Sequence, residues 1–463
     1  MYARRDPKLK RDLMGMLFTS VLTGIFVLSL SLTAPAANNM LQVPEIWTLR
    51  NSVQFSLANS PDSRVARQHM AIAAASVDQA RVDYYPQVDI SAQYGQTNNP
   101  MYSFGNILNH GVFTPNINFN DPGRSDNLNV RVDVAYRFYN GGRDQAAIEA
   151  AEAGFAGSSS AREAVYSRLA FEVVRSFQSI VQAQEMLEAR KISLIAIRAS
   201  IAVAQARYQA GDLLKADLLN LAVQESRASE NLILAEHRLE LSEKVFLNLL
   251  GLESGTVCID SKADGAQQLP AERNYYNRPE LRSLAHIEET ARAKLAIARG
   301  GNLPTVDGFA SYQYDNGWVM GGSGDSWMAG VKVNYRLFGG HKTSADVASA
   351  LAELARIKEE RKRAELGMDL EVKQADLNYR QSMQRLGVTE KMVEQATESA
   401  RLSRTRFKEG VILSSDLVDV EMRLVDALVR QSVAKTNILV ALADLRRAMG
   451  LPQFDDVTEV ELP

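Results

Sequence analysis

The amino-acid sequence predicts an α+β membrane protein in which each chain contributes four β-strands and long antiparallel helices, arranged as two tandem repeats. Three observations predict this fold: a set of motifs that occurs twice at a constant spacing, strands that alternate strictly between apolar and polar residues, and very long stretches without proline. The formal net charge is −3 with 23% charged residues, which argues against a nucleic-acid-binding surface.

The N-terminus has the pattern of a signal peptide over residues 1–36. Basic residues precede an apolar core at residues 17–32, and the small residues Ala34 to Ala37 give a cleavage site near position 36/37. An uncleaved membrane anchor is the alternative, although the apolar run is short for a span. The single cysteine, Cys258, cannot form an intrachain disulfide.

One turn motif occurs twice in the sequence, as "RYQAGDLLKADLLN" from Arg207 and as "RFKEGVILSSDLVD" from Arg406. The two copies are 199 residues apart. The same offset relates "RFYNGG" to "RLFGGH" and "LLGL" to "AMGL", whereas "NSPD" and "NRPE" further upstream are 218 apart. The difference falls in an insertion within the first copy. The predicted divisions are an N-terminal equatorial segment (37–58), a first repeat (59–251), an equatorial linker (252–276), a second repeat (277–450) and a C-terminal tail (451–463).

Each repeat contains a predicted β-hairpin, at residues 86–139 and 304–338. In "PQVDISAQY" and "LNVRVDVAYRF" the apolar and polar side chains alternate over about ten residues, as in membrane strands with an apolar outer and a polar inner side. A half-buried sheet outside a membrane would alternate equally well. The charged residues expected on the inner, lumen-facing side are Arg131, Asp133, Arg137, Lys332 and Arg336.

Long helices are predicted after each hairpin, from Gly142 to Tyr208 and from His341 to Phe407, each about 100 Å long. The turns at 207–217 and 406–416 then lead into helices of roughly 55 Å, and the helix before each hairpin spans roughly 30 Å. Two short helices stacked end to end would match one long helix. Each repeat therefore supplies two helical columns of similar height.

Four strands are too few to close a membrane barrel, and an open sheet edge is not stable in lipid. Ring symmetry removes the open edges. Three chains would supply 12 strands and 12 helical columns.

From about Asn59 to Leu451 the chain resembles the TolC-type outer-membrane efflux family. The resemblance depends on the duplicated helix–hairpin–helix order, the strand ends "YNGG" and "FGG", and the two R-[YF]-x-x-G turns. It implies an outer-membrane channel of a tripartite efflux or type I secretion system that passively conducts substrates from an inner-membrane pump of RND or ABC type. It also implies a homotrimer, in which a 12-stranded β-barrel is continuous with a 12-helix periplasmic α-barrel. The implied partners are two more copies, a periplasmic adaptor protein and outer-membrane lipid, with a large periplasmic portion. A non-conducting coiled-coil scaffold in the envelope is the alternative.

In this family the second turn has aspartates six and nine residues after its glycine, which match Asp416 and Asp419. With Asp217 and Asn220 of the first copy, the resemblance implies a periplasmic constriction. Capping of the return helices is an alternative reason for Asp217 and Asp416. The tyrosine and arginine that lock the entrance in some members are replaced by Phe407 and Ile412, so that lock cannot form here.

At both turns a glycine, Gly211 or Gly410, should end the long helix in the left-handed conformation. The neighbouring apolar residues are expected to be exposed for docking of the adaptor, with packing inside the tip as the alternative; they are Leu213, Leu214, Val411, Ile412 and Leu413.

Two further features concern the barrel. Arg137 and Arg336 occupy strand ends where family members often have proline, and are expected either near the barrel rim or simply solvated. The long loop from Gly95 to Asn127 is expected outside the cell, as a passive surface loop or as a partial cover of the mouth. No metal-ligand spacing, nucleophile motif or phosphate-binding loop is present, so we expect no enzyme, metal or cofactor.

Overall fold

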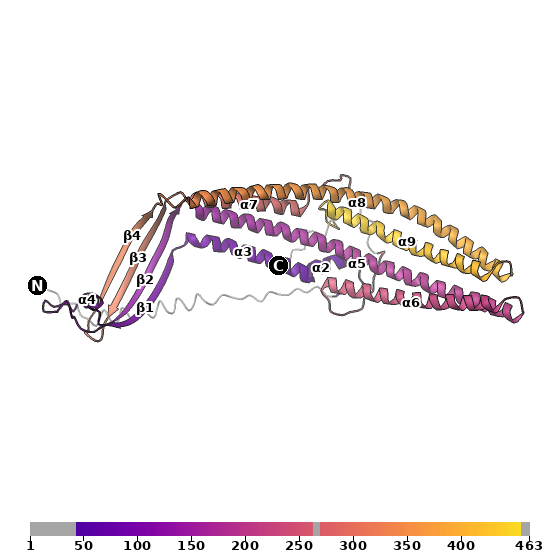
Figure 1. Ribbon diagram of the computed structural model, residues 1–463, viewed down its shortest axis with the longest axis horizontal. Helices are drawn as coiled ribbons and strands as arrows, with labels where there is room; N and C mark the ends of the chain where they lie inside the picture. Colours follow the sequence, from indigo (N-terminus) through magenta and orange to yellow (C-terminus); the bar gives the residue numbers. More distant parts are fainter. Residues whose placement is uncertain (1–42, 263–268, 455–463) are drawn as a thin grey trace. The chain divides into compact units, whose positions relative to one another are not determined.

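The computed structural model describes residues 43–262 and 269–454, so the predicted signal peptide and most of the predicted tail lie outside the described residues. The first repeat contains α2 (Leu49–Asn59), α3 (Pro61–Arg81), a short 3-10 turn η1 (Val82–Tyr84), β1 (Gln87–Thr97), α4 (Pro100–Asn109), β2 (Ser125–Asn140), α5 (Arg143–Gln209) and α6 (Lys215–Leu250). The second contains α7 (Pro279–Gly300), β3 (Thr305–Asn316), β4 (Ser323–Asn334), α8 (Lys342–Lys408) and α9 (Ser414–Ala448). The predicted four strands and long helices are confirmed (Figure 1).

The four strands form one antiparallel sheet in the order β1-β2-β3-β4. Directly paired residues share a face, so the register defines both faces of the sheet. Val132 pairs with Ile90 and Tyr312 on the apolar face, and Arg131 pairs with Ser91 and Gln313 on the polar face. The predicted alternation is therefore continuous across the sheet.

One strand end differs from the prediction. β4 ends at Asn334, so Arg336 lies beyond the strand and is not one of its inward-facing residues. On β2 the register shifts between Arg137 and Tyr139, which leaves Phe138 as a bulge. The strand continues past Arg137 to Asn140, and Arg137 pairs with Asp307.

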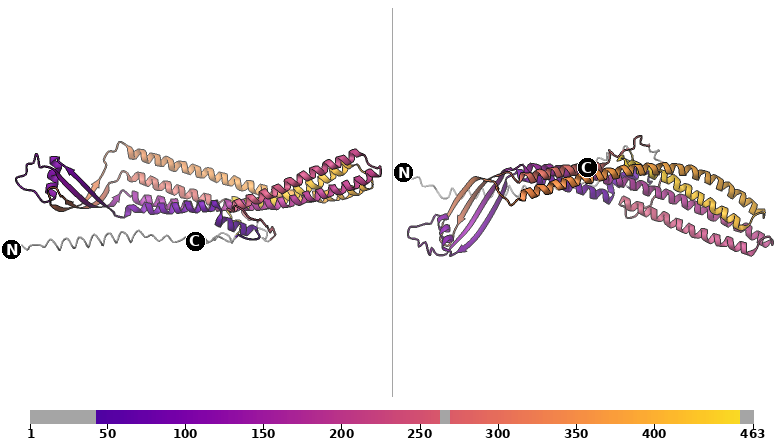
Figure 2. Two further views of the ribbon diagram at one scale, coloured as in Figure 1. Left: turned by 90° about the horizontal axis from the view of Figure 1, so that it is seen from below. Right: turned by 45° about the horizontal axis from the view of Figure 1, so that its top comes forward.

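The two longest helices, α5 and α8, have 67 residues each, because neither contains a proline and both are rich in alanine and other good helix formers. Each folds back through a tight turn, α5 onto α6 and α8 onto α9 (Figure 1). Near these turns, α5 also contacts α9, which gives the order α6-α5-α9-α8. Near the sheet, α5 lies between α3 and α7, and α7 packs on α8 (Figure 2).

The return helices end where the short helices begin, as predicted. Gly251 ends α6 with a φ of +79°, and a Cβ there would lie 3.0 Å from the carbonyl oxygen of Asn59. Gly450 follows α9 with a φ of +74° and contacts the backbone of Asn277. A side chain at either glycine would separate the two stacked helices.

A buried core lies beside the first of these junctions. Trp47 packs edge-on against Phe55 and Phe246, and all three side chains are buried. The amide of Trp47 donates to the carbonyl of Cys258 at 2.7 Å, so the N-terminal segment and the linker pair as a short parallel bridge. The two segments predicted as equatorial thus pack together.

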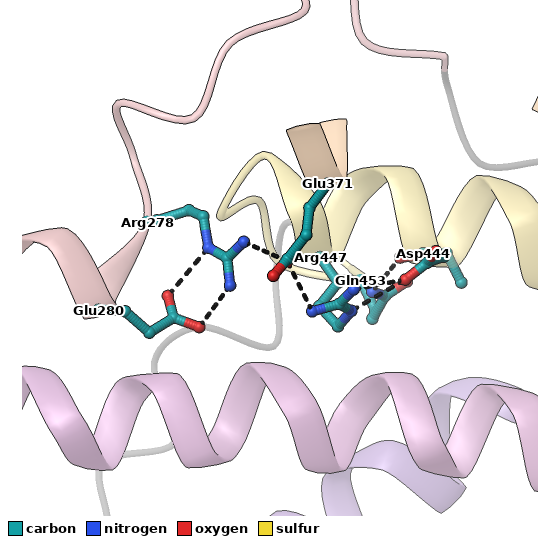
Figure 3. Close-up of polar contacts among 7 residues, drawn as sticks. Arg278, Glu280, Glu371, Asp444, Arg447 and Gln453 are labelled. Atoms are coloured by element: carbon teal, nitrogen blue, oxygen red, sulfur yellow. Dashed lines mark hydrogen bonds and ion pairs between the residues drawn. The ribbon is translucent and has the colours of Figure 1, made fainter. Parts of the chain in front are cut away.

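An ion-pair network occupies the second junction (Figure 3). Arg278, whose side chain is only 6% exposed, donates to both oxygens of Glu280 and, at 2.6 Å, to Glu371 on α8. Arg447 of α9 lies 3.6 Å from Glu371 and donates to Asp444. Burial lowers the pKa of Arg278, but its hydrogen bonds to the two glutamates raise it by more, so the guanidinium stays charged. The first repeat has Ser60 in place of Arg278 and lacks this network.

The loop between β1 and β2 contains α4, a helix that the sequence pattern did not predict. None of the helices in the described ranges combines the length and low polarity that a membrane span requires.

Candidate functional site at the hairpin tips

Two helical hairpin tips lie side by side, one between α5 and α6 and the other between α8 and α9 (Figure 1). At each tip a glycine has the predicted left-handed backbone, with φ of +87° at Gly211 and +81° at Gly410. The next amide donates back to the helix end, from Asp212 to Arg207 and from Val411 to Arg406, both at 2.9 Å. These bonds satisfy the last carbonyls and allow the chain to reverse in a few residues.

A shared apolar cluster holds the two tips together. Its buried members come from α5, α6, α8 and α9, and they are Leu194, Ile197, Ala204, Leu221, Phe407, Leu417 and Val418. Leu213 and Ile412 are partly buried against this cluster, so the expectation that they are exposed was wrong. Leu214, Val411 and Leu413 are exposed, at 71%, 68% and 63%. Of the five apolar residues expected to be exposed at the tips, these three are.

Arg207 connects the first tip to the second. Its guanidinium donates to the carbonyl of Phe407 at 2.9 Å and lies 5.4 Å from the centre of the Phe407 ring. A second hydrogen bond, of 3.4 Å, reaches the carbonyl of Asp212 in its own tip. Arg207 therefore caps the C-terminal end of α8 in addition to bonding within its own tip.

Asp217 and Ser414 form a second connection between the tips. The Ser414 hydroxyl is buried and donates to Oδ1 of Asp217 at 2.8 Å. Asp217 is thus half-buried and bonded to the other repeat, whereas Asn220 one turn later is exposed. The sequence resemblance gave both residues the same role, but they have different surroundings here.

Asp416 and Asp419 lie on the exposed face of the first turns of α9. Asp419 is within 3.8 Å of Arg423, and about two helical turns further along α9 Asp426 pairs with Arg430 at 2.6 Å. No ion pair involves Asp416 among the pairs found in the described residues. The exposed face of α9 therefore alternates charges, with one unneutralised carboxylate nearest the tip.

Sequence reasoning missed the ion pair between Arg404 and Glu421. The two side chains form a bidentate pair across the second hairpin, at 2.5 and 2.7 Å, and Glu421 is buried. The hydrogen bonds with Glu421 raise the pKa of Arg404. A glutamate between apolar residues of α9 was the available signal, because a buried carboxylate needs a partner.

On the polar face of the sheet, Arg131 donates to Asp133 at 2.8 Å, and Lys332 pairs across strands with Asp307. Arg137 lies 3.3 Å from Asp144 of α5 and 3.3 Å from Asp83 of the η1 turn. Arg137 therefore joins the strand end to the helices and is not merely a solvated arginine.

The chain contains one helix–β-hairpin–helix unit twice. A single sheet and the two paired helical tips join the two copies. The structure therefore defines a class of duplicated proteins with long antiparallel helices. Residues 53–252 and 274–451 match the outer membrane efflux protein family, and the chain belongs to this family. The two matched segments lie close to the predicted repeats.

Named relatives agree with this assignment. The chain is 22% identical over 434 residues to outer membrane protein TolC of Vibrio cholerae, covering 90% of this chain and 94% of the relative. It is 24% identical over 319 residues to protein CyaE of Bordetella pertussis, covering 66% and 64%.

Solved structures share the fold. The outer-membrane channel OprN has a TM-score of 0.75 at 19% identity, with 87% of this chain and 89% of that chain covered. The CmeC outer membrane channel of Campylobacter jejuni has a TM-score of 0.76 at 15% identity, with 89% and 87% covered. The resemblance and the predicted outer-membrane location with a large periplasmic portion are confirmed. OprN and CmeC are both outer-membrane channels.

Proposed function

We propose that the chain forms a homotrimeric outer-membrane channel of a tripartite efflux or type I secretion system. It conducts substrates passively from an inner-membrane pump of RND or ABC type, through a periplasmic adaptor, to the exterior. The observation that supports this most strongly is a sheet that has one apolar and one polar face and an unpaired strand at each edge. This sheet continues into a layer of helices whose two edge helices also lack a neighbour on one side.

The sheet supports ring closure. Its outer strands, β1 and β4, pair on one side only within the described residues. Its apolar face is strongly exposed at Val88, Ile90, Trp327 and Val331. Unpaired backbone groups are costly in lipid, and joining β1 of one copy to β4 of the next satisfies them in a 12-stranded barrel.

The helices support the same closure. Near the tips the edge helices are α6 and α8, and both have exposed apolar side chains on their free sides. On α6 these are Leu219, Val223, Ile233, Leu234 and Leu241, and on the part of α8 that pairs with α9 they are Leu377, Val388 and Leu402. Contact between α6 of one copy and α8 of the next would bury both rows and complete a 12-helix α-barrel.

In this assembly the polar face of the sheet lines the lumen, with Arg131, Asp133 and Lys332 on it. Asp416 and Asp419 form the charged periplasmic constriction, with Asp217 and Asn220 beside them. The exposed apolar residues Leu214, Val411 and Leu413 dock the adaptor.

Native mass measurement on protein extracted from isolated outer membranes tests this proposal. We expect a detergent-solubilised complex of three chains. A monomer recovered from the soluble periplasmic fraction would contradict the proposal and favour a non-conducting coiled-coil scaffold.

A further inference from the structure

We propose that the insertion in the first hairpin forms an outer closure of the channel, in which three copies of α4 meet through their apolar sides at the barrel axis. This inference depends on the proposed homotrimer.

Helix α4 packs on the polar face of the sheet. Asn106 donates to Ser125 at 3.0 Å, and His110 bonds with Asn127 at 2.9 Å. Ser125 and Asn127 belong to the same alternating set of β2 residues as Arg131 and Asp133. The helix therefore lies on the side that faces the lumen in the proposed barrel, at the end of the sheet away from the long helices (Figure 1).

The side of α4 toward the sheet is mixed, and its exposed side is apolar. Ser103 and Ile107 of α4 are buried, as is His110 directly after it. Three other apolar side chains are exposed, at 81% for Met101, 67% for Tyr102 and 51% for Leu108. Met101 and Leu108 are seven residues, about two helical turns, apart and lie on one side of the helix, with Tyr102 at the edge of that side.

The insertion is held in this position by contacts with the second hairpin. The carboxylate of Asp126 accepts from the amides of Trp318 and Val319, the latter at 2.7 Å. The Asn127 side chain donates to Asp315 at 2.5 Å, and Asp315 is buried. Phe104 of α4 is partly covered by Phe113 and Phe119 of the same loop, whereas Met101, Tyr102 and Leu108 stay exposed on a helix that is fixed to the sheet.

The dimensions indicate that a second copy is what covers this surface. A ring of twelve tilted strands has a radius of roughly 12 Å, and a helix with its side chains is about 10–12 Å wide. A helix on the inner wall thus reaches the axis, where symmetry brings two more. Lipid is on the opposite, apolar face. The absence of Asp, Glu, Lys and Arg from Gly95 to Asn120 removes charge repulsion between the three copies.

Cysteine cross-linking in isolated outer membranes tests the contact. In a Cys258→Ser background, Leu108→Cys should give covalently linked chains with a short bifunctional thiol reagent. Val132→Cys, on the apolar face of the sheet, should give none. A native trimer in which Leu108→Cys gives no more cross-linking than Val132→Cys would overturn the closure and leave the proposed channel intact. A monomer would overturn both.

A second experiment measures closure from outside the cell. In the same background, Ser311→Cys places a thiol on the polar face of β3. A membrane-impermeant maleimide added to whole cells should label it severalfold faster when Met101, Tyr102 and Leu108 are all changed to serine. Serine at Val43 and Ile46, two exposed apolar residues of the N-terminal segment, is the matched control and should leave the rate unchanged. Equal rates in all three proteins would overturn the closure.

Discussion

The hydroxyl of Ser414 donates a 2.8 Å hydrogen bond to Asp217, so the first turns of the two return helices are joined across the repeats. Asp217 belongs to the first tip and Ser414 begins the helix of the second. Any movement that separates the two hairpins must break this bond. We therefore expect the pair to restrain the opening of the entrance.

Ser414→Ala should loosen the tips, because it leaves the half-buried carboxylate without its buried donor. The expected loss is about 1–2 kcal/mol of local stability. Hydrogen exchange at residues 405–418 should accelerate accordingly. Ser415→Ala, at the exposed neighbouring position, is the control, and equal exchange in both variants would exclude the restraint.

Arg207→Ala should loosen the same tips by a different route. The variant loses the bond to the Phe407 carbonyl and the contact with its ring, together worth about 1–2 kcal/mol. Protease cleavage at the turn 409–413 should become faster. Arg406 occupies the equivalent position in the second repeat and is exposed, so Arg406→Ala should have little effect. The prediction fails if both variants are cleaved alike.

Within the proposed constriction, Asp416 and Asp419 should contribute unequally to cation selectivity. Asp419 is within 3.8 Å of Arg423, whereas Asp416 has no such neighbour among the described ion pairs. Asp416→Asn should therefore reduce cation selectivity more than Asp419→Asn, measured as a reversal potential under a salt gradient. Asp426→Asn, at a carboxylate paired with Arg430, is the control. A larger effect from Asp419→Asn would contradict this ranking.

Acid should weaken the attachment of the linker through Asp376. Burial raises the pKa of this carboxyl, but hydrogen bonds from Arg273 and Arg380 lower it by more, to below the ordinary value of 3.8. Because the folded pKa is depressed, the stabilisation is complete above 3.8 and is lost as the pH falls through the folded value.

Asp376→Asn should accordingly increase hydrogen exchange in residues 269–276 at neutral pH, and the difference from the native protein should shrink below pH 3.8. Asp369→Asn disrupts only an exposed pair with Lys373 and should have a small effect at any pH. A difference that persists unchanged in acid would show that Asp376 does not act through its charge.

Most of the fold could be predicted from the sequence, because the patterns that indicate its helices, turns and strands are local and occur in both repeats. The length of α5 and α8 follows from proline-free stretches, and the turns follow from Gly211 and Gly410. The faces of the sheet follow from alternation, which depends only on the pleat.

The contacts between the repeats could not be predicted in this way. The bonds from Arg207 to Phe407 and from Ser414 to Asp217 join residues about two hundred positions apart, and neither residue type reveals its partner. Helix α4 was missed because both a serine and an isoleucine are buried on its inner side while Met101, Tyr102 and Leu108 are exposed, so its sequence lacks the pattern of an amphipathic helix. Leu213 and Ile412 were expected at the surface, but the shared tip cluster partly buries them.

Single-channel recording of the purified protein in a planar lipid bilayer tests the central claim most directly. If three chains form one continuous conduit, the native complex should give discrete conductance steps with a preference for cations, and Asp416→Asn should reduce that preference. A purified trimer that inserts into the bilayer and gives no steps would contradict the proposal that this chain is a channel.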